Sequence, residues 1–255
     1  MGVLDAFNLA GRVALVTGAG RGLGQAMACA LAEAGADIAG VYRSRFEETQ
    51  AQVTARGRRF LPVACDLRSA SVAELCEVVD RTVSGLGRLD ILVNNAGIIH
   101  RKPALDYDEE DWDDVIQVDL KALFFLSQAA ARVMIPQGGG KIIQVASLLS
   151  FQGGILCPAY TAAKSGVAGL TRALANEWAQ KGINVNAIAP GYMATDLAAA
   201  HLANPERYQA ILARIPAGRW GEPEDVKGAV LFLASNASDY LHGAVLPIDG
   251  GWLAR

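Results

Sequence analysis

The stretch Thr17-Gly18-Ala19-Gly20-Arg21-Gly22-Leu23-Gly24 decides the fold. It follows the β-branched run Val13 to Thr17 and precedes Gln25 to Ala34, whose apolar residues recur at helical spacing. Backbone N–H groups at the start of a helix attract anions, and glycine lets a pyrophosphate approach the backbone closely. Alone, such a string is typical of any tight turn, but between a strand and a helix it predicts a dinucleotide-binding loop. The expected contacts are Gly18, Arg21, Gly22, Leu23 and Gly24.

Outward from this loop, short β-branched runs alternate with longer stretches of helical period. This alternation predicts the α/β class: a single doubly wound (Rossmann) domain, with a seven-stranded parallel sheet and helices on both faces. Pro62 lacks the N–H that a central strand needs, so its strand is expected at a sheet edge, as the 3-2-1-4-5-6 order requires. The expected strands are Val13 to Thr17, Asp37 to Tyr42, Phe60 to Cys65, Ile91 to Asn94, Lys141 to Ala146, Ile183 to Ala189 and Val245 to Ile248.

Two helical patterns and one long connection complete this outline. Gln25 to Ala34 ends at Gly35, and the apolar residues from Val72 to Val83 end before Gly85, so both predict crossover helices. The interval 191–223 is longer than a plain connection between a strand and a helix. It contains two helical patterns, Asp196 to Ala203 and Pro205 to Ile215, and we expect it to act as a substrate lid within one domain spanning residues 1–255.

Composition narrows the class of function. The chain has 255 residues, of which 52% are hydrophobic, and its 23 Lys and Arg against 26 Asp and Glu give a net charge of −3. Neither disorder nor a polybasic nucleic-acid surface fits this balance, so we expect a small-molecule substrate and no nucleic acid. Apolar runs such as Ala122 to Leu126 are too short for a membrane span, and the first residues lack a signal pattern. The four cysteines have neither disulfide nor zinc spacing, which favours a cytoplasmic protein without a metal.

The far end of the dinucleotide site is expected at the ends of the second to fourth strands. The place of an acidic ribose-binding residue holds Tyr42-Arg43-Ser44-Arg45 instead, so Arg43 or Arg45 either neutralises a 2′-phosphate or is simply solvated. Asp66, followed by Leu67, either accepts a hydrogen bond from adenine or caps a helix. Asn94-Asn95-Ala96-Gly97 ends the fourth strand at the carboxyl edge of the sheet, where ligands bind. Expected contacts here are Tyr42, Arg43, Asp66, Leu67, Asn94, Ala96 and Gly97.

Tyr160 and Lys164 are the candidates for chemistry. Four residues apart on an expected helix from Ala159 to Ala179, they emerge from one face, one turn apart. A phenol with an ordinary pKa of about 10 must approach about 7 to act as a base, and one ammonium lowers it by only about 1 to 3. An oxidised nicotinamide would add the missing positive charge, which links the two motifs in one hydride-transfer mechanism. Ser147, at the end of the fifth strand, is expected to hydrogen-bond the substrate oxygen.

In their order and spacing these motifs resemble the short-chain dehydrogenase/reductase family over essentially the whole chain. The resemblance implies Ser147 and Tyr160 as polariser and acid/base, and Lys164 as both a pKa-lowering charge and a ribose ligand. It also implies Pro190-Gly191 beside the nicotinamide, with Met193 near them, and a homotetramer. The residues that carry it are Thr17 to Gly24, Asn94 to Gly97, Ser147, Tyr160-Thr-Ala-Ala-Lys164 and Pro190-Gly191.

Within the family, other stretches are similar to enzymes acting on a deoxy-hexonate of the 2-dehydro-3-deoxy-D-gluconate type. The likeness implies interconversion of a hydroxyl and a ketone on such a sugar acid. Enzymes of that group are usually described as NAD-linked, which pulls against the arginines after Tyr42, so NAD(H) and NADP(H) both stay open. A 3-oxoacyl-thioester reductase or another polyol or ketone reductase, and a non-catalytic dinucleotide sensor, remain as alternatives. The stretches are Asp111 to Val115, Phe124 to Gln128, Ser150 to Gly154, Asn184 to Asp196 and Asp249 to Arg255.

One position departs from the family pattern. Where the family usually has asparagine before the fifth strand, this chain has Asp119. An aspartate accepts hydrogen bonds but cannot donate as an amide does, so we expect slow but real turnover.

A sugar acid needs a cation for its carboxylate, and Arg101 in the triplet His100-Arg101-Lys102 is the first candidate. An ordinary solvated charge run is the alternative reading of this triplet. Gln152 and Met193 are expected to line the substrate pocket.

Overall fold

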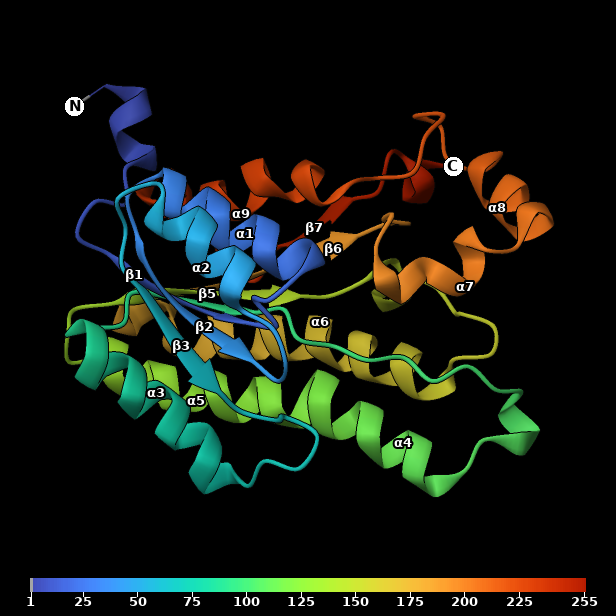
Figure 1. Cartoon of the computed structure of the whole chain (residues 1–255), viewed down its shortest axis with the longest axis horizontal. Coiled ribbons are helices and arrows are strands. Elements are labelled where there is room, and N and C mark those ends of the chain that lie inside the picture. The colour runs from blue at the N-terminus through green and yellow to red at the C-terminus, as the bar shows by residue number, and fades with distance from the viewer. Residues whose placement is uncertain (1) are drawn as a thin grey trace.

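The computed structural model describes residues 2–255, apart from the side chains of residues 200 and 201. Within them, seven strands form one fully parallel sheet in the order β3-β2-β1-β4-β5-β6-β7. Figure 1 shows the sheet between layers of helices. This confirms the expected α/β class, and β3 lies at the edge as Pro62 requires. The strands are β1 (Val13–Thr17), β2 (Asp37–Tyr42), β3 (Phe60–Ala64), β4 (Ile91–Asn94), β5 (Gly140–Val145), β6 (Ile183–Pro190) and β7 (Val245–Ile248).

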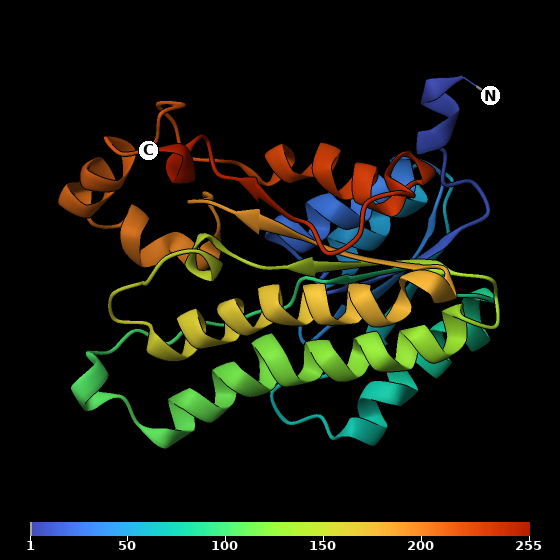
Figure 2. The same ribbon diagram turned by 180° about the vertical axis from the view of Figure 1, so that it is seen from behind.

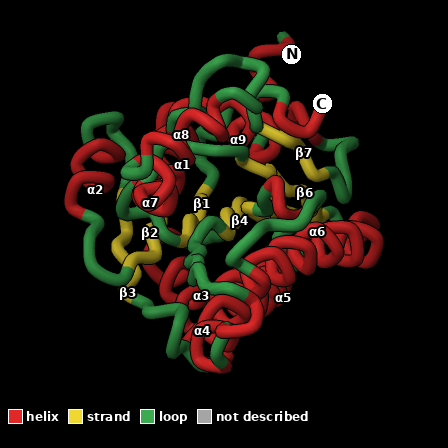
Figure 3. The backbone as a smooth tube through the Cα atoms, turned by 90° about the vertical axis from the view of Figure 1, so that its right-hand side faces the viewer, coloured by secondary structure: helices red, strands yellow, loops and turns green. Residues whose placement is uncertain are grey.

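Helices cover both faces of the sheet. In the end-on view of Figure 3, α1 and α9 lie on one side of the strands and α3, α5 and α6 on the other. Figure 2 shows α5 and α6 crossing the same face. The helices are α1 (Gly22–Glu33), α2 (Glu47–Thr54), α3 (Val72–Leu86), α4 (Glu109–Ile116), α5 (Ala122–Met134), α6 (Pro158–Trp178), α7 (Ala199–Leu202), α8 (Pro205–Leu212) and α9 (Lys227–Ala234).

Side chains of the central strands alternate between two cores. In β1, Val13 and Leu15 belong to the core that includes residues of α3 and α5, whereas Ala14 and Val16 belong to the core that includes residues of α1 and α9. All four are at most 2% exposed. A parallel strand covered on both faces needs apolar residues at every position, which explains the unbroken apolar sequence of β1.

Helix ends follow their capping residues, with one correction. Ser71 accepts a hydrogen bond from the N–H of Glu74 and starts α3. The helix was expected to end before Gly85, but it continues to Leu86, and Gly87 ends it with a left-handed φ of 92°. Gly85 lies inside the helix and does not end it. A Cβ at this position would come within 2.7 Å of Leu61 Cδ2, so the small size of Gly85 serves packing against β3.

All strands point their carboxyl ends toward one edge, where α7 and α8 also lie (Figure 1). The interval 191–223 contains a short 3-10 turn, Asp196–Ala198 (η6), followed by α7 and α8. The two expected helical patterns are therefore present, although the second helix ends at Leu212 rather than Ile215. Among the described helices none is both long and apolar enough to cross a bilayer, and all four cysteines are free thiols.

Candidate active site

A cavity of about 1050 Å³ opens along the carboxyl edge of the sheet. Its wall runs from the glycine loop and the end of β2, past the turn after β4, to the loop after β5 and the first turns of α6. The segment after β6 closes another side of it. This is the crevice in which open parallel sheets bind ligands, and it is long enough for a dinucleotide and a small substrate.

The glycine loop leaves room for a pyrophosphate. Gly18, Arg21, Gly22, Leu23 and Gly24 all line the cavity, as expected. Gly22 has a left-handed φ of 55°, and a Cβ on Gly24 would overlap the carbonyl oxygen of Gly18. The start of α1 therefore packs directly against the end of β1, with its free N–H groups facing the cavity end of the sheet. A dinucleotide fits this cradle.

The part of the cavity beside the ends of β2 and β3 contains residues that the sequence singled out. Tyr42, Arg43, Arg45, Asp66 and Leu67 line the cavity. Arg43 and Arg45 are exposed, and neither guanidinium has a hydrogen-bond or ion-pair partner within the described part of the chain. Asp66 Oδ1 accepts the N–H of Arg68 at 3.1 Å, so this side chain shapes its own turn as well as lining the cavity.

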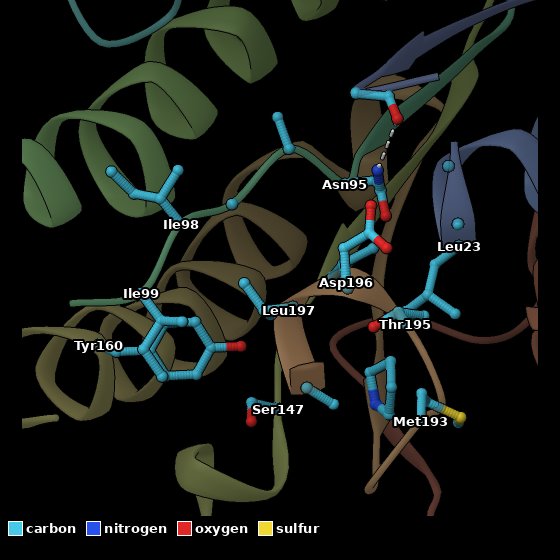
Figure 4. Close-up of a pocket in the computed structure, with 18 of the residues that line it drawn as sticks. Leu23, Asn95, Ile98, Ile99, Ser147, Tyr160, Met193, Thr195, Asp196 and Leu197 are labelled. Atoms are coloured by element: carbon cyan, nitrogen blue, oxygen red, sulfur yellow. Dashed lines mark hydrogen bonds between the residues drawn. The ribbon is translucent and has the colours of Figure 1, made fainter. Parts of the chain in front are cut away.

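Asn94 was expected to contact the dinucleotide, but its position in the structure differs from this expectation. It does not line the cavity, because its side chain is buried under α5, where Nδ2 donates to Ser127 Oγ at 3.0 Å and to Gln144 Oε1 at 2.9 Å. The next residue lines the cavity instead. Asn95 Nδ2 donates to the carbonyl of Thr17 at 2.8 Å and to that of Gly18 at 3.4 Å, which ties the turn after β4 to the glycine loop. Figure 4 marks a hydrogen bond of the Asn95 amide with a dashed line. Ala96 and Gly97 line the cavity as expected.

Ser147, Tyr160 and Lys164 meet at the far end of the cavity. In Figure 4 the Tyr160 hydroxyl, Ser147 and Leu197 lie near one another, and Asp196 and Thr195 lie farther away, toward Leu23. Ser147 Oγ accepts the N–H of Leu149 at 3.2 Å, which orients the hydroxyl at the start of a 3-10 turn, Leu148–Ser150 (η4). Lys164 Nζ lies 5.5 Å from the centre of the Tyr160 ring.

Lys164 is buried and held by two acceptors. Its Nζ donates to the carbonyl of Val145 at 2.9 Å and lies 3.2 Å from Asp119 Oδ2. Asp119 is itself fully buried in a π-helical turn, Gln117–Lys121 (η3), and its Oδ1 accepts the N–H of Ile98 at 2.8 Å. Asp119 lies behind the cavity wall, against Gly97, and does not line the cavity.

The charges of this cluster determine the state of the phenol. Burial raises the pKa of Tyr160, Lys164 and the hydrogen bond with Ser147 lower it, and Asp119 raises it further, so that the net pKa is above its ordinary value. The expected lowering by Lys164 is present but is outweighed. Burial would lower the pKa of Lys164, but Asp119 and Tyr160 outweigh it and the pKa is raised, so the ammonium stays charged. The phenol therefore needs more positive charge nearby to act as a base.

Only some of the residues expected to contact the substrate line the cavity. Arg101 lines the cavity, and its Nη1 and Nη2 both lie 3.4 Å from the carbonyl oxygen of Leu197. Lys102 faces away to Asp108 and Asp111, which raise its pKa, and it does not line the cavity. Gln152 is a further correction, because it is outside the cavity wall and accepts a hydrogen bond from Trp252 Nε1 at 3.3 Å.

Pro190, Gly191 and Met193 line the cavity as expected. Residues 194–198, which follow them and also line the cavity, are called the roof below. Asp196 in this roof pairs with Arg21 of the glycine loop at 2.6 Å. The sequence did not single out Asn95 or the Asp196 pair. Alternation along the strand could have indicated that Asn95, rather than Asn94, faces the cavity. The contact between Arg21 and Asp196 joins segments 175 residues apart and has no local sequence signal.

Comparisons with known proteins agree with this site. A family model described as enoyl-(acyl carrier protein) reductase matches residues 18–253. Over 254 residues the chain is 57% identical to 2-dehydro-3-deoxy-D-gluconate 5-dehydrogenase of Escherichia coli strain K12, covering 99% of this chain and 100% of that protein. The protein of the same name from Dickeya dadantii is 55% identical with the same coverage.

A solved structure shares the fold. It is a crystal structure, with bound NADP, of an Agrobacterium tumefaciens protein provisionally named 2-deoxy-D-gluconate 3-dehydrogenase. The two chains are 52% identical and superpose with a TM-score of 0.90 over 98% of this chain and 100% of the other. With the glycine loop, the parallel sheet and the full-length matches in agreement, the chain belongs to the short-chain dehydrogenase/reductase family of NAD(P)-dependent oxidoreductases.

Proposed function

We propose that the protein interconverts a secondary alcohol and a ketone on a deoxy-hexonate, with Ser147, Tyr160 and Lys164 as its catalytic residues. The observation that carries the proposal is that these three side chains converge on the end of a cavity whose other end is a glycine loop. The substrate class is supported by the names of the full-length relatives from Escherichia coli and Dickeya dadantii.

The proposed mechanism assigns one task to each side chain. The bound dinucleotide supplies the hydride acceptor or donor and, when oxidised, a positive charge beside the phenol. In the oxidation direction Tyr160 Oη accepts the hydroxyl proton, and Ser147 donates a hydrogen bond to the substrate oxygen. The positive charge of Lys164 stabilises the phenolate, and Asp119 keeps this ammonium charged in a buried position. In the reduction direction Tyr160 returns the proton.

For the dinucleotide we propose NADP(H). Residues 43–46, between β2 and α2, include no carboxylate that would accept the two ribose hydroxyls of NAD, and the exposed Arg43 and Arg45 offer unpaired guanidinium groups beside the cavity. The bound NADP in the Agrobacterium tumefaciens structure supports the same choice. Replacing Arg43 by Ala should then lower kcat/KM for NADP about tenfold and leave that for NAD nearly unchanged.

We further propose that Arg101 binds the substrate carboxylate. A guanidinium forms short, charge-assisted pairs with a carboxylate, and its two contacts with the Leu197 carbonyl are long at 3.4 Å. Arg101→Ala should raise KM for a hexonate by at least tenfold, whereas Arg101→Lys should raise it less. An unchanged KM in Arg101→Ala would rule out this role.

We also propose how the domain, its assembly and its compartment are organised. Residues 1–255 form one catalytic domain in which 191–223 acts as a lid, because this segment supplies one wall of the cavity. Four copies form a homotetramer, and the protein works in the cytoplasm. The free state of the four cysteines is what a reducing compartment maintains.

The experiment is a spectrophotometric screen. Deoxy-hexonates, gluconate, polyols and 3-oxoacyl thioesters are each assayed with NAD(H) and NADP(H), for the wild-type protein and for Tyr160→Phe. The proposal expects the highest kcat/KM with a deoxy-hexonate and its loss in Tyr160→Phe. Activity confined to acyl thioesters would favour a second candidate, a thioester reductase, which the description of the matching family model suggests. Dinucleotide binding without turnover of any compound would favour a sensor.

A further inference from the structure

The catalytic side chains belong to two separate elements. Ser147 follows β5, whereas Tyr160 and Lys164 lie on α6, and residues 148–157 connect them. This connection contains η4 and reaches Leu156, which has a left-handed φ of 63° and lies 47% exposed. A connection of this kind does not by itself fix the distance between Ser147 and Tyr160. Contacts between η4 and α6 have to do so.

Ser150 makes the contact that joins the two elements directly. Its Oγ accepts the backbone N–H of Ser147 at 3.3 Å and donates to the backbone carbonyl of Lys164 at 2.6 Å. That carbonyl lies inside α6, where helical geometry already supplies one N–H, so Ser150 uses its second lone pair. One half-buried hydroxyl therefore bridges the backbones of two proposed catalytic residues.

We propose that Ser150 is a positioning residue, whose hydroxyl holds the Ser147 turn at the distance from α6 at which Ser147 and Tyr160 share one substrate oxygen. The inference rests on the proposed function, since it takes the roles of Ser147, Tyr160 and Lys164 from there. It adds a residue that touches neither substrate nor cofactor and acts only through the backbone. A displacement of about 1 Å between reacting groups costs on the order of a hundredfold in rate, so a partial displacement is measurable.

Ser165 provides a matched control. Its Oγ donates to the carbonyl of Leu149 at 3.2 Å, so it also links α6 to η4 through one serine hydroxyl. Ser165 is exposed, and its contact involves the backbone of no proposed catalytic residue. Removing either hydroxyl takes one hydrogen bond from the same interface, but only Ser150 bridges Ser147 and Lys164.

The test compares Ser150→Ala, Ser150→Thr and Ser165→Ala in the full-length protein, with whichever alcohol and dinucleotide the wild type uses best. We expect kcat to fall about tenfold in Ser150→Ala with an unchanged KM for the dinucleotide, and to recover in Ser150→Thr, which keeps the hydroxyl. The pH at which alcohol oxidation is half-maximal should rise in Ser150→Ala, because Tyr160 loses the hydrogen bond from Ser147 that lowers its pKa. The other ionisable groups that act on Tyr160 are Lys164, Asp119 and Cys157, and none is altered.

Ser165→Ala should keep the wild-type kcat and pH profile. The proposal is overturned when Ser150→Ala has the same kcat and the same pH profile as Ser165→Ala, or when Ser150→Thr does not recover the wild-type kcat. Should Ser150→Ala not fold, Ser150→Cys replaces it, since a thiol donates only weakly; an unchanged kcat there also overturns the proposal. Failure of the substrate assignment is separable, because these ratios hold for any alcohol. Failure of the catalytic assignment shows itself independently as an active Tyr160→Phe.

Discussion

Asp119 determines the electrostatics around the phenol at the scale of single residues. Its carboxylate is fully buried, accepts the N–H of Ile98 and faces the ammonium of Lys164 at 3.2 Å. Its charge raises the pKa of Tyr160 and also that of Lys164. The substitution of aspartate for the usual asparagine therefore secures a charged lysine but opposes formation of the phenolate.

Replacing Asp119 by Asn should make the enzyme faster at neutral pH and less stable. Loss of the carboxylate removes a charge that raises the pKa of Tyr160, while the hydrogen bond to Val145 still holds the Lys164 ammonium in place, so the rise of alcohol oxidation with pH should begin at lower pH. The free energy of unfolding should decrease by about 3 kcal/mol, because Lys164 is left buried without its counterion. A pH profile of kcat/KM and a urea titration measure the two effects, and a slower Asp119→Asn enzyme would contradict this account.

The placement of a residue at the cavity was predictable from the sequence where a motif fixes direction as well as position. A helix places Tyr160 and Lys164 on one face, and the cavity contains both. Asn94 and Gln152 failed because only tertiary packing decides which way a residue at a strand end or in a loop turns. Asn94 turns into the core toward Ser127, and Gln152 turns to Trp252, which is 100 residues away in sequence.

At the scale of elements, the roof after β6 reaches across the cavity through exposed polar contacts. Asp196 pairs with Arg21, and the carbonyl of Leu197 faces Arg101, so the roof touches both sides of the cavity. The Arg21–Asp196 pair is exposed, with side chains 63% and 71% accessible, and contributes little to folding stability. We expect the pair to affect the rate at which the dinucleotide dissociates instead.

Asp196→Asn should release the dinucleotide about threefold faster, with an unchanged melting temperature. The dissociation rate is measured by stopped-flow fluorescence of the reduced dinucleotide. Glu224→Gln is the control, since it removes another surface pair, with Lys227 at 3.7 Å. Equal rates in Asp196→Asn, Glu224→Gln and wild type would show that the pair does not hold the roof.

The base of the roof is fixed by Asp225. Its carboxylate accepts two hydrogen bonds from Arg219 and one from the N–H of Glu222, all at 2.7 Å, and its pKa is lowered to about 2. A folded-state pKa below the unfolded value of about 4 stabilises the protein above that pH, and the contribution disappears as pH falls from about 4 to 2.

Asp225→Asn should therefore lower the free energy of unfolding by about 1 kcal/mol at pH 7, a value reduced for the exposure of Arg219. Urea titrations of both proteins between pH 7 and acid pH should show the difference shrinking below about pH 4. A difference that stays constant with pH would mean that Asp225 acts without its charge.

The elements themselves were largely predictable. Four of the seven strands, β1, β2, β4 and β7, have the expected bounds, and the other three differ by one residue at one or both ends, because β-branched runs bounded by glycine and polar residues locate strands well. Helix ends were harder. Gly85 and Gly87 are both plausible stops, and only the contact with Leu61 shows that the first is a packing residue.

At the scale of the whole molecule, the site draws on segments spread over most of the chain. The cavity wall draws on residues from Gly18 to Pro223, and all strands except β7 end beside residues that line it. The order of the strands was predictable from the family resemblance and from Pro62. The closure of the cavity by segments far apart in sequence was not, since no local pattern encodes it.

Assembly is the remaining prediction at this scale. A homotetramer should have four times the chain mass of 26.8 kDa when measured by light scattering at micromolar concentration. A monomer mass under these conditions would contradict the expected assembly.

The central claim is that Tyr160 transfers the proton while the dinucleotide transfers the hydride. The most direct measurement is kcat for formation of reduced dinucleotide by Tyr160→Phe, compared with wild type, together with the Kd of the dinucleotide for both. We predict that kcat falls by about 10² to 10⁴, with Kd changed less than about threefold, since only the acid/base group is lost. A Tyr160→Phe enzyme that keeps more than about a tenth of the wild-type kcat would contradict the account.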